Sequence, residues 1–370
     1  MSRDPPSSPA LPLVAQPSNK LVDTPKIPRF DASPGLSINR VILGRWQFSG
    51  GHRGDLATDR TSGSRAVDDI VEGVSRYGLS TQDTADIYGS SQELVGQARQ
   101  RLVKAGTRME VLTKLCVFAP EEFDEAVRHP DLFVRKRIDT SKRAMGYGSS
   151  DPLDCVQLYW HEYERPGLLE TFEALVRARD DGLIRSVGTT NFNTEKLEIL
   201  TDRVGNGGLS LNQIQFSVID PRPCNAQIEF CKLRNVAVLA FGATAGGFLS
   251  DKYLGVPAGQ VIADTFSKRK YASIISERGG WSWFQGLLQI LSEVARRHGV
   301  TIAQVAQRYP LQRGADAIIL GARNNAHLPE TVGLFDFQLT SEDLGLIDEY
   351  VGRRQPLSDV YEWERGLGPF

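Results

Sequence analysis

Short runs of β-branched and aliphatic residues alternate with amphipathic helical stretches from residue 41 onward. This alternation is typical of a parallel sheet that is covered by helices. The runs predict eight strands, which begin near residues 41, 79, 109, 153, 184, 209, 236 and 316. The stretches between them carry apolar residues at steps of three and four, as in SRAVDDIVEGVSRYG and LLETFEALVRARDDG. Eight such units favour a closed (β/α)8 TIM barrel over an open sheet.

The barrel domain is predicted to occupy residues 27–352, which is within the size range of this fold. The segment IPRFDASPGLSINR precedes the first strand and predicts a β-hairpin that caps the barrel floor. Residues 245–282 are expected to form a long loop after strand seven, suited to a lid over a ligand. Residues 1–26 are rich in Pro and Ser and predict a disordered tail, and residues 353–370 a C-terminal tail.

The charge balance argues against some partners. The chain has 43 Lys and Arg against 45 Asp and Glu, a formal net charge of −2, so nucleic acid is not expected as a partner. No apolar run reaches the roughly 20 residues that cross a bilayer, so no membrane partner is expected. The scattered histidines and cysteines show no metal-ligand spacing. We expect a cytoplasmic monomer or homo-oligomer, with organellar targeting by the N-terminal segment as the alternative.

Polar residues gather where the predicted strands end. Asp83 ends the second strand and Tyr88 follows it, Lys114 lies on the third strand, and His161 follows the fourth. Taken singly, each is more often a helix cap, a solvated charge or a packed imidazole. Together at the catalytic rim of a barrel they suit proton transfer, because a cation beside a tyrosine lowers its pKa from the usual value of about 10.

Two segments are similar to the signatures of the aldo-keto reductases. DTADIYGSSQELVG from residue 83 resembles D-T-A-x-x-Y-G-x-S-E, with Gln92 at the position of the Glu, and GLIRSVGTTNF from residue 182 resembles G-x-I-R-x-x-G-x-S-N-F. VLTKLC resembles the lysine strand of the family, PLDCVQLYWHEY its D-L-x-x-x-H segment, and LNQIQFS its N-Q strand. The segment ILGARNNAHLPET is more similar to the branch that includes the potassium-channel β subunits. The likeness extends from residue 27 to about residue 350.

The resemblance implies a role for each rim residue. Tyr88 is expected to be the general acid, Lys114 and Asp83 to tune it, and His161 to shape the carbonyl site. The chain has no G-x-G-x-x-G turn after a strand, so the nicotinamide cofactor of the family must bind without a Rossmann domain.

The resemblance also implies the cofactor contacts. Those of the nicotinamide are Thr190, Asn191, Gln213 and Phe241, where Phe241 takes the place of a stacking tyrosine. Those of the phosphates are Lys252, Arg323 and His327, with Lys268 or Arg269 as further cations. One bidentate arginine recognises a phosphate, so NADP(H) is favoured over NAD(H). Trp46 and Trp160, at strand ends beside the catalytic positions, are expected to line the substrate pocket.

These features predict an enzyme that reduces an aldehyde or ketone, or that oxidises an alcohol or sugar in reverse. The alternative is a cofactor-binding redox sensor or regulatory subunit with little turnover, in keeping with the channel β subunits. A lyase-like role without net redox has no positive support in the sequence.

Overall fold

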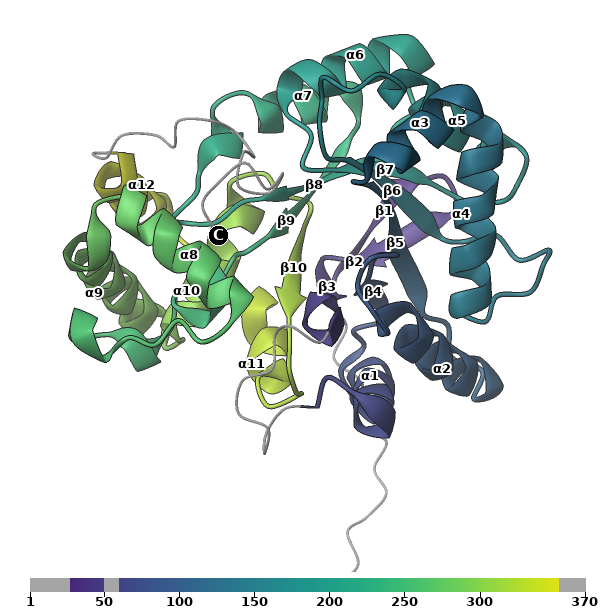
Figure 1. Cartoon of the computed structure of the whole chain (residues 1–370). Helices are drawn as coiled ribbons and strands as arrows, with labels where there is room; N and C mark the ends of the chain where they lie inside the picture. The colour runs from purple at the N-terminus through teal and green to yellow at the C-terminus, as the bar shows by residue number, and fades with distance from the viewer. Residues whose placement is uncertain (1–26, 50–59, 353–370) are drawn as a thin grey trace, which may run out of the picture.

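A closed barrel of parallel strands forms the centre of the molecule (Figure 1). The computed structural model describes residues 27–49 and 60–352. Each predicted strand is present, and each pairs with its neighbours in chain order until β10 closes on β3. The (β/α)8 prediction is confirmed. The barrel strands are β3 Val41–Gly44, β4 Thr81–Asp83, β5 Glu110–Val117, β6 Cys155–Trp160, β7 Val187–Thr190, β8 Leu211–Gln215, β9 Ala237–Phe241 and β10 Ala317–Gly321.

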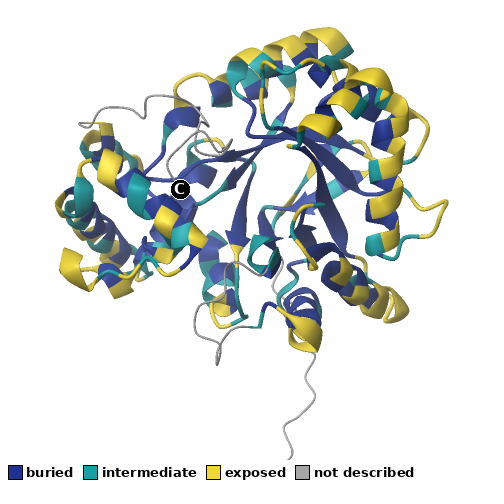
Figure 2. Ribbon diagram, in the orientation of Figure 1, coloured by how far each residue is buried: buried dark blue, intermediate teal, exposed yellow. Residues whose placement is uncertain are grey.

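Helices surround the barrel, so almost every strand residue is buried (Figure 2). Strands covered on both faces read as continuous apolar runs, which is why the sequence shows them without alternation. The helices are α1 Gly63–Tyr77, α2 Ser91–Lys104, α3 Pro120–Arg128, α4 Pro130–Ala144, α5 Leu168–Asp180, α6 Thr194–Val204, α7 Gln227–Arg234, α8 Phe266–Glu277, α9 Gly280–His298, α10 Ile302–Gln312, α11 Leu328–Val332 and α12 Ser341–Gly352.

The predicted hairpin closes the amino-terminal end of the barrel. It consists of β1 Arg29–Ser33 and β2 Leu36–Asn39, which pair antiparallel around Gly35 at a φ of +80°. The side chains of Leu36 and Ile38 are fully buried. They pack with side chains from the lowest layer of the barrel interior, among them Ile42, Leu112, Cys155, Leu211 and Leu239. The floor is therefore an apolar plug.

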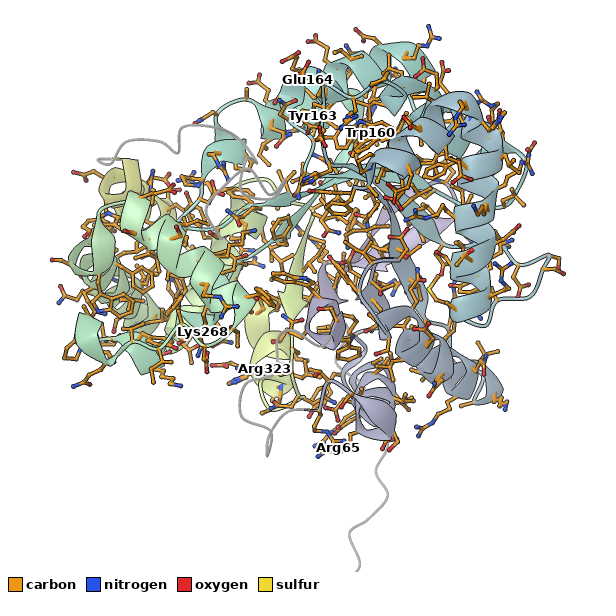
Figure 3. The ribbon with its side chains drawn as sticks, viewed as in Figure 1. Arg65, Trp160, Tyr163, Glu164, Lys268 and Arg323 are labelled. Atoms are coloured by element: carbon orange, nitrogen blue, oxygen red, sulfur yellow. The ribbon has the colours of Figure 1, made fainter. Side chains whose placement is uncertain are left out.

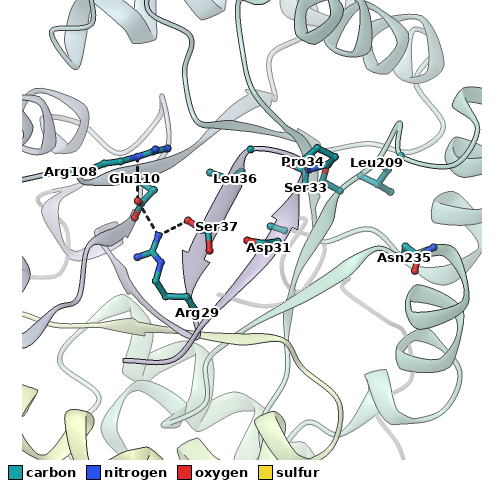
Figure 4. A pocket seen from close by; sticks show the side chains of 14 residues that line it. Arg29, Asp31, Ser33, Pro34, Leu36, Ser37, Arg108, Glu110, Leu209 and Asn235 are labelled. Carbon is teal, nitrogen blue, oxygen red and sulfur yellow. Dashed lines mark hydrogen bonds and ion pairs between the residues drawn. The ribbon is translucent and has the colours of Figure 1, made fainter. Parts of the chain in front are cut away.

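A hollow of about 680 Å³ lies outside this plug, between the hairpin and the neighbouring loops (Figure 4). Arg29 crosses it, forms an ion pair of 3.0 Å with Glu110 and donates a hydrogen bond to the backbone oxygen of Ser37. Parallel barrels carry their chemistry at the carboxyl ends of the strands. This hollow lies at the opposite end, so we do not place the functional site here.

The connection after β9 differs from the prediction. Residues 245–282 were expected to be a loop, but helix α8 forms within them. Thr265 caps α8 by accepting a hydrogen bond from the backbone of Lys268, and Tyr271, Ile274 and Ile275 are buried on one face. A Cβ on Gly242 would lie 2.3 Å from the Tyr271 hydroxyl, so glycine lets α8 approach the carboxyl end of β9. The segment is long, as predicted, yet largely ordered by packing.

The predicted tails at residues 1–26 and 353–370 lie outside the described residues. Within the described part of the chain, no helix has the length and apolar character needed to span a membrane.

Candidate active site

A buried ion pair lies inside the barrel near the carboxyl ends of its strands. Lys114, midway along β5, donates a hydrogen bond of 2.6 Å to Asp83 Oδ2 and one of 3.0 Å to the backbone oxygen of Thr84. The side chains of Lys114 and Asp83 are 3% and 4% exposed, so water screens the pair very little. Burial alone lowers the pKa of Lys114, but Asp83 and Tyr88 oppose it and the net shift is upward. The lysine therefore carries a positive charge.

Side-chain amides donate further hydrogen bonds to Asp83. Gln157 and Gln213 donate to its Oδ1 from 3.1 and 2.7 Å, and Gln213 also donates to Gln157 Oε1 from 2.9 Å. The Thr190 hydroxyl donates to the same Gln157 oxygen from 3.3 Å. A buried carboxylate needs several donors, and Gln157 of β6 and Gln213 of β8 supply two of them in addition to Lys114. The network joins four predicted residues, Asp83, Lys114, Thr190 and Gln213, to one that was not predicted, Gln157.

Tyr88 lies on the loop between β4 and α2, and its ring centroid is 5.0 Å from Lys114 Nζ. Burial raises the pKa of Tyr88 to about 12, although the charge of Lys114 opposes this shift. The charge of Lys114 acts to lower the pKa of Tyr88, as expected. The predicted net lowering of this pKa is wrong, because the effect of desolvation is larger than that of Lys114. The phenol is thus protonated at neutral pH, as a general acid must be.

An ion pair fastens the loop that carries Tyr88. Asp86, two residues earlier, accepts hydrogen bonds from Nε of Arg137 at 3.1 Å and from the backbone of Cys116 at 3.3 Å. Arg137 in turn donates to Glu122 from 2.7 Å. These contacts tie the loop to β5 and to helices α3 and α4. Tyr88 is therefore held by a network that does not depend on a ligand.

His161 follows β6 and is half-buried. Its Nδ1 lies 3.1 Å from the hydroxyl of Tyr159, and its ring centroid lies 4.8 Å from that of Phe118. Tyr159 itself packs with Ala85 and Cys116, in the small cluster against which Tyr88 also packs. His161 is therefore joined to this cluster through a residue that the sequence interpretation passed over.

The two pocket tryptophans have different positions. Trp46 is partly exposed in the 3-10 helix η1 (Trp46–Ser49), directly after β3, which is compatible with its predicted place at the rim. Trp160 is 1% exposed and its ring packs edge-on against Phe123 of α3, with centroids 5.0 Å apart. The predicted pocket role of Trp160 is wrong, because side chains alternate along a strand and this one points outward to the helices.

The end of β7 offers a place for a nicotinamide. Asn191 is 7% exposed at a φ of 63°, and its backbone is fixed by Gln213 O, 2.8 Å from its nitrogen, and by the Tyr163 hydroxyl, which donates to its oxygen from 2.6 Å. Its side-chain Oδ1 is buried and has no hydrogen-bond partner among the described residues. A buried acceptor needs a donor, and the NH2 group of a carboxamide is one. Thr190 ends β7 and Phe241 ends β9, and β8 lies between these two strands.

Two of the predicted cations, Lys268 and Arg323, lie in the same part of the molecule (Figure 3). Lys268 donates to Asp264 from 2.8 Å, and both this bond and the charge of Arg323 lower the pKa of Asp264. Lys268 and Arg323 therefore share one neighbourhood. The side chain of His327 is 86% exposed, and its Nδ1 lies 3.6 Å from Oε2 of Glu330.

Lys252 lies on the 3-10 helix η4 (Asp251–Tyr253) and is exposed, with its ammonium 5.7 Å from the Tyr253 ring centroid. No contact in the described part of the chain joins Lys252 to the Lys268 and Arg323 neighbourhood, so its cofactor role stays a prediction. In residues 27–49 and 60–352, no group of three or more His, Cys, Asp and Glu side chains is arranged to hold a metal ion.

Known proteins resemble this chain in sequence. The model of the "Aldo/keto reductase family" matches residues 40–351. Dihydrodiol dehydrogenase 3 of Bos taurus is 26% identical over 290 residues, which are 72% of this chain and 77% of that protein. Flagellar radial spoke protein 5 of Chlamydomonas reinhardtii is 28% identical over 193 residues, but these cover 46% of this chain and only 36% of that protein.

Solved structures share the fold. The glycerol dehydrogenase AKR11B4 from Gluconobacter oxydans superimposes with a TM-score of 0.67 at 22% identity, covering 91% of this chain and 97% of that one. The Bombyx mori aldo-keto reductase AKR2E4, solved in complex with NADP, gives 0.63 at 22% identity, covering 92% and 97%. With the family model matching most of the chain and the structural neighbours sharing its barrel, the protein belongs to the aldo/keto reductase family.

Proposed function

We propose that this protein reduces an aldehyde or ketone to the alcohol with NADP(H) as cofactor, and that Tyr88 is the general acid. The observation that carries the proposal is the buried Lys114 and Asp83 pair, which leaves a cation 5.0 Å from the ring of a protonated tyrosine. A reduced nicotinamide, when bound, supplies a hydride to the carbonyl carbon. Tyr88 donates its proton to the carbonyl oxygen and so neutralises the negative charge that forms there.

The protein groups divide this task. Tyr88 donates its proton to the oxygen and becomes a phenolate, which water then reprotonates. Lys114 stabilises that phenolate because its charge lies close to the ring in a region that water barely reaches. Asp83 keeps Lys114 charged and in place, and Asp83 is itself fixed by Gln157 and Gln213.

The proposed cofactor contacts lie at the rim, and those to the 2′-phosphate carry the preference for NADP(H). Asn191 Oδ1 suits the carboxamide NH2, and the ring of Phe241 offers an apolar face for stacking. Arg323 and Lys268 provide two cations for a 2′-phosphate. The complex of the Bombyx mori relative with NADP supports the same choice, and NAD(H) is the alternative.

The test is the oxidation of NADPH and of NADH at 340 nm by the purified protein with a panel of aldehydes and ketones. Tyr88→Phe should lose about 10² to 10⁴ of kcat, the usual contribution of a positioned acid. Tyr147→Phe is the matched control, since Tyr147 bonds Asp154 at the amino-terminal end of β6. Tight cofactor binding without turnover on any carbonyl would instead favour the cofactor-sensing alternative.

A further inference from the structure

The register of two strands defines what faces the carbonyl site. Lys114 of β5 pairs with Gln157 of β6, and Cys116 pairs with Tyr159. The side chains of Lys114 and Gln157 both reach Asp83, so they point into the barrel. Because side chains alternate along a strand, Cys116 and Tyr159 point into the same interior, one layer closer to the rim. Tyr159 therefore faces the space above the ion pair.

Tyr159 brings a second phenol next to Tyr88. It is 5% exposed and belongs to the cluster with Ala85 and Cys116 on which Tyr88 packs. Its ring stacks on Phe118, with centroids 4.9 Å apart and an angle of 30° between the planes. The ring is fixed by these contacts, which leaves the hydroxyl group as the chemically active part of the side chain.

His161 controls the direction of that hydroxyl. A phenol donates one hydrogen bond and accepts others, and a neutral imidazole carries its proton on one of two nitrogens. If the proton is on Nδ1 of His161, the imidazole donates to the Tyr159 oxygen across the 3.1 Å contact. The Tyr159 proton is then not used in this contact. Phe118 lies against both rings and holds the two groups together.

We propose that Tyr159 is a second catalytic residue, which donates a hydrogen bond to the carbonyl oxygen of the substrate beside Tyr88. His161 is then a positioning residue that acts through Tyr159. This inference rests on the proposed reductase function. A carbonyl oxygen has two lone pairs, and negative charge grows on it as the hydride arrives, so a second prepositioned donor stabilises the transition state more than the ground state.

The decisive variant is Tyr159→Phe, which keeps the ring and its stacking on Phe118 and removes only the oxygen. We expect kcat/KM for carbonyl reduction to fall about 10²-fold, the usual loss on removing one such donor. The dissociation constant for NADPH, followed by quenching of protein fluorescence, should stay within twofold of wild type. The control is again Tyr147→Phe, which removes a tyrosine hydroxyl from the other end of β6 and should leave kcat/KM unchanged.

The role of His161 is tested by a pair of variants. His161→Asn places an amide nitrogen near the position of Nδ1 and should recover most of the activity, whereas His161→Leu should lose nearly as much as Tyr159→Phe. The double variant Tyr159→Phe/His161→Leu should be no slower than Tyr159→Phe alone, because both remove one interaction. His161→Leu also probes the hydroxyl if Tyr159→Phe does not fold.

Three results would overturn the inference. If wild type is active and Tyr159→Phe has the same kcat/KM, Tyr159 is not a catalytic residue, and the reductase function still stands. Losses that multiply in the double variant show that His161 does not act through Tyr159. If wild type itself reduces no carbonyl, the proposed function and this inference fall together, so the wild-type rate distinguishes the two failures.

Discussion

Two adjacent layers of the same barrel interior have opposite characters. The lower layer contains Ile42, Leu112, Cys155, Leu211 and Leu239, which pack against the hairpin. Two residues further along three of these strands, the side chains are those of Lys114, Gln157 and Gln213. One layer buries apolar surface and stabilises the fold. The next layer toward the rim buries an ion pair and its amides, which stabilise the fold little and which we propose serve the chemistry.

The largest effect is expected from Lys114→Met, which removes one partner of the buried pair. Asp83 then remains as an uncompensated buried charge, so the free energy of unfolding should fall by about 3 to 5 kcal/mol. Carbonyl reduction should fall by roughly 10³-fold, because the Tyr88 phenolate loses its cation. Urea unfolding and the NADPH oxidation rate measure the two quantities.

The double variant Asp83→Asn/Lys114→Met sharpens this prediction. Removing both charges should recover most of the stability and none of the activity. Recovery of both would mean that the pair is only structural.

Leu112→Ala should show the reverse pattern in the lower layer. Leu112 is fully buried against the hairpin, so its truncation should cost about 2 to 5 kcal/mol of unfolding free energy. The kcat of the folded protein should stay close to wild type, measured at a temperature where the variant remains folded. A large loss of kcat would contradict the separation of the two layers.

Arg323→Ala tests the rim outside both layers. Loss of one charge-assisted contact to a phosphate should weaken NADPH binding about 10- to 100-fold, with NADH binding unchanged. Titration of both cofactors by fluorescence measures this. Equal weakening of both would show that Arg323 supports the loop instead of the 2′-phosphate.

The pH dependence should show the smallest change. Burial raises the pKa of Tyr88 to about 12, so reduction should lose little activity between pH 7 and 10. Since the pKa is raised on folding, the stability linked to Tyr88 is complete below pH 10 and is lost as the pH rises toward 12. A pH series of kcat and of the unfolding midpoint checks both statements. A fall in kcat centred below pH 9 would mean that Tyr88 ionises much more easily than its burial implies.

The architecture could be predicted from the sequence because the patterns that indicate it are local. Eight apolar runs, helical periodicity and the turn at Gly35 each reflect neighbouring residues. Helix α8 was missed although Thr265 is a good cap and Tyr271, Ile274 and Ile275 follow helical spacing. The Gly and Lys residues spread over residues 245–282 instead favour a loop for the whole segment.

The site was harder to predict because β6 is buried on both faces. Without alternation, the apolar run does not reveal whether Tyr159 or Trp160 points inward, and the place of Trp160 at the strand end favours Trp160. The motif D-L-x-x-x-H contains a signal for Tyr159, because its His lies five positions after its Asp. In this chain the residue five positions after Asp154 is Tyr159, and His161 is two positions later. The register with β5 settles which side chains face the barrel.

The most direct test of the account is a single-turnover experiment on the protein with bound NADPH. Mixing it with a reactive aldehyde should cause the cofactor absorbance at 340 nm to decay, more slowly when the transferred hydrogen is deuterium. In Tyr88→Phe the decay should slow at least about 10²-fold while the cofactor remains bound. A decay that is the same in wild type and Tyr88→Phe would contradict the assignment of the general acid, and no decay with any carbonyl would contradict the reductase function.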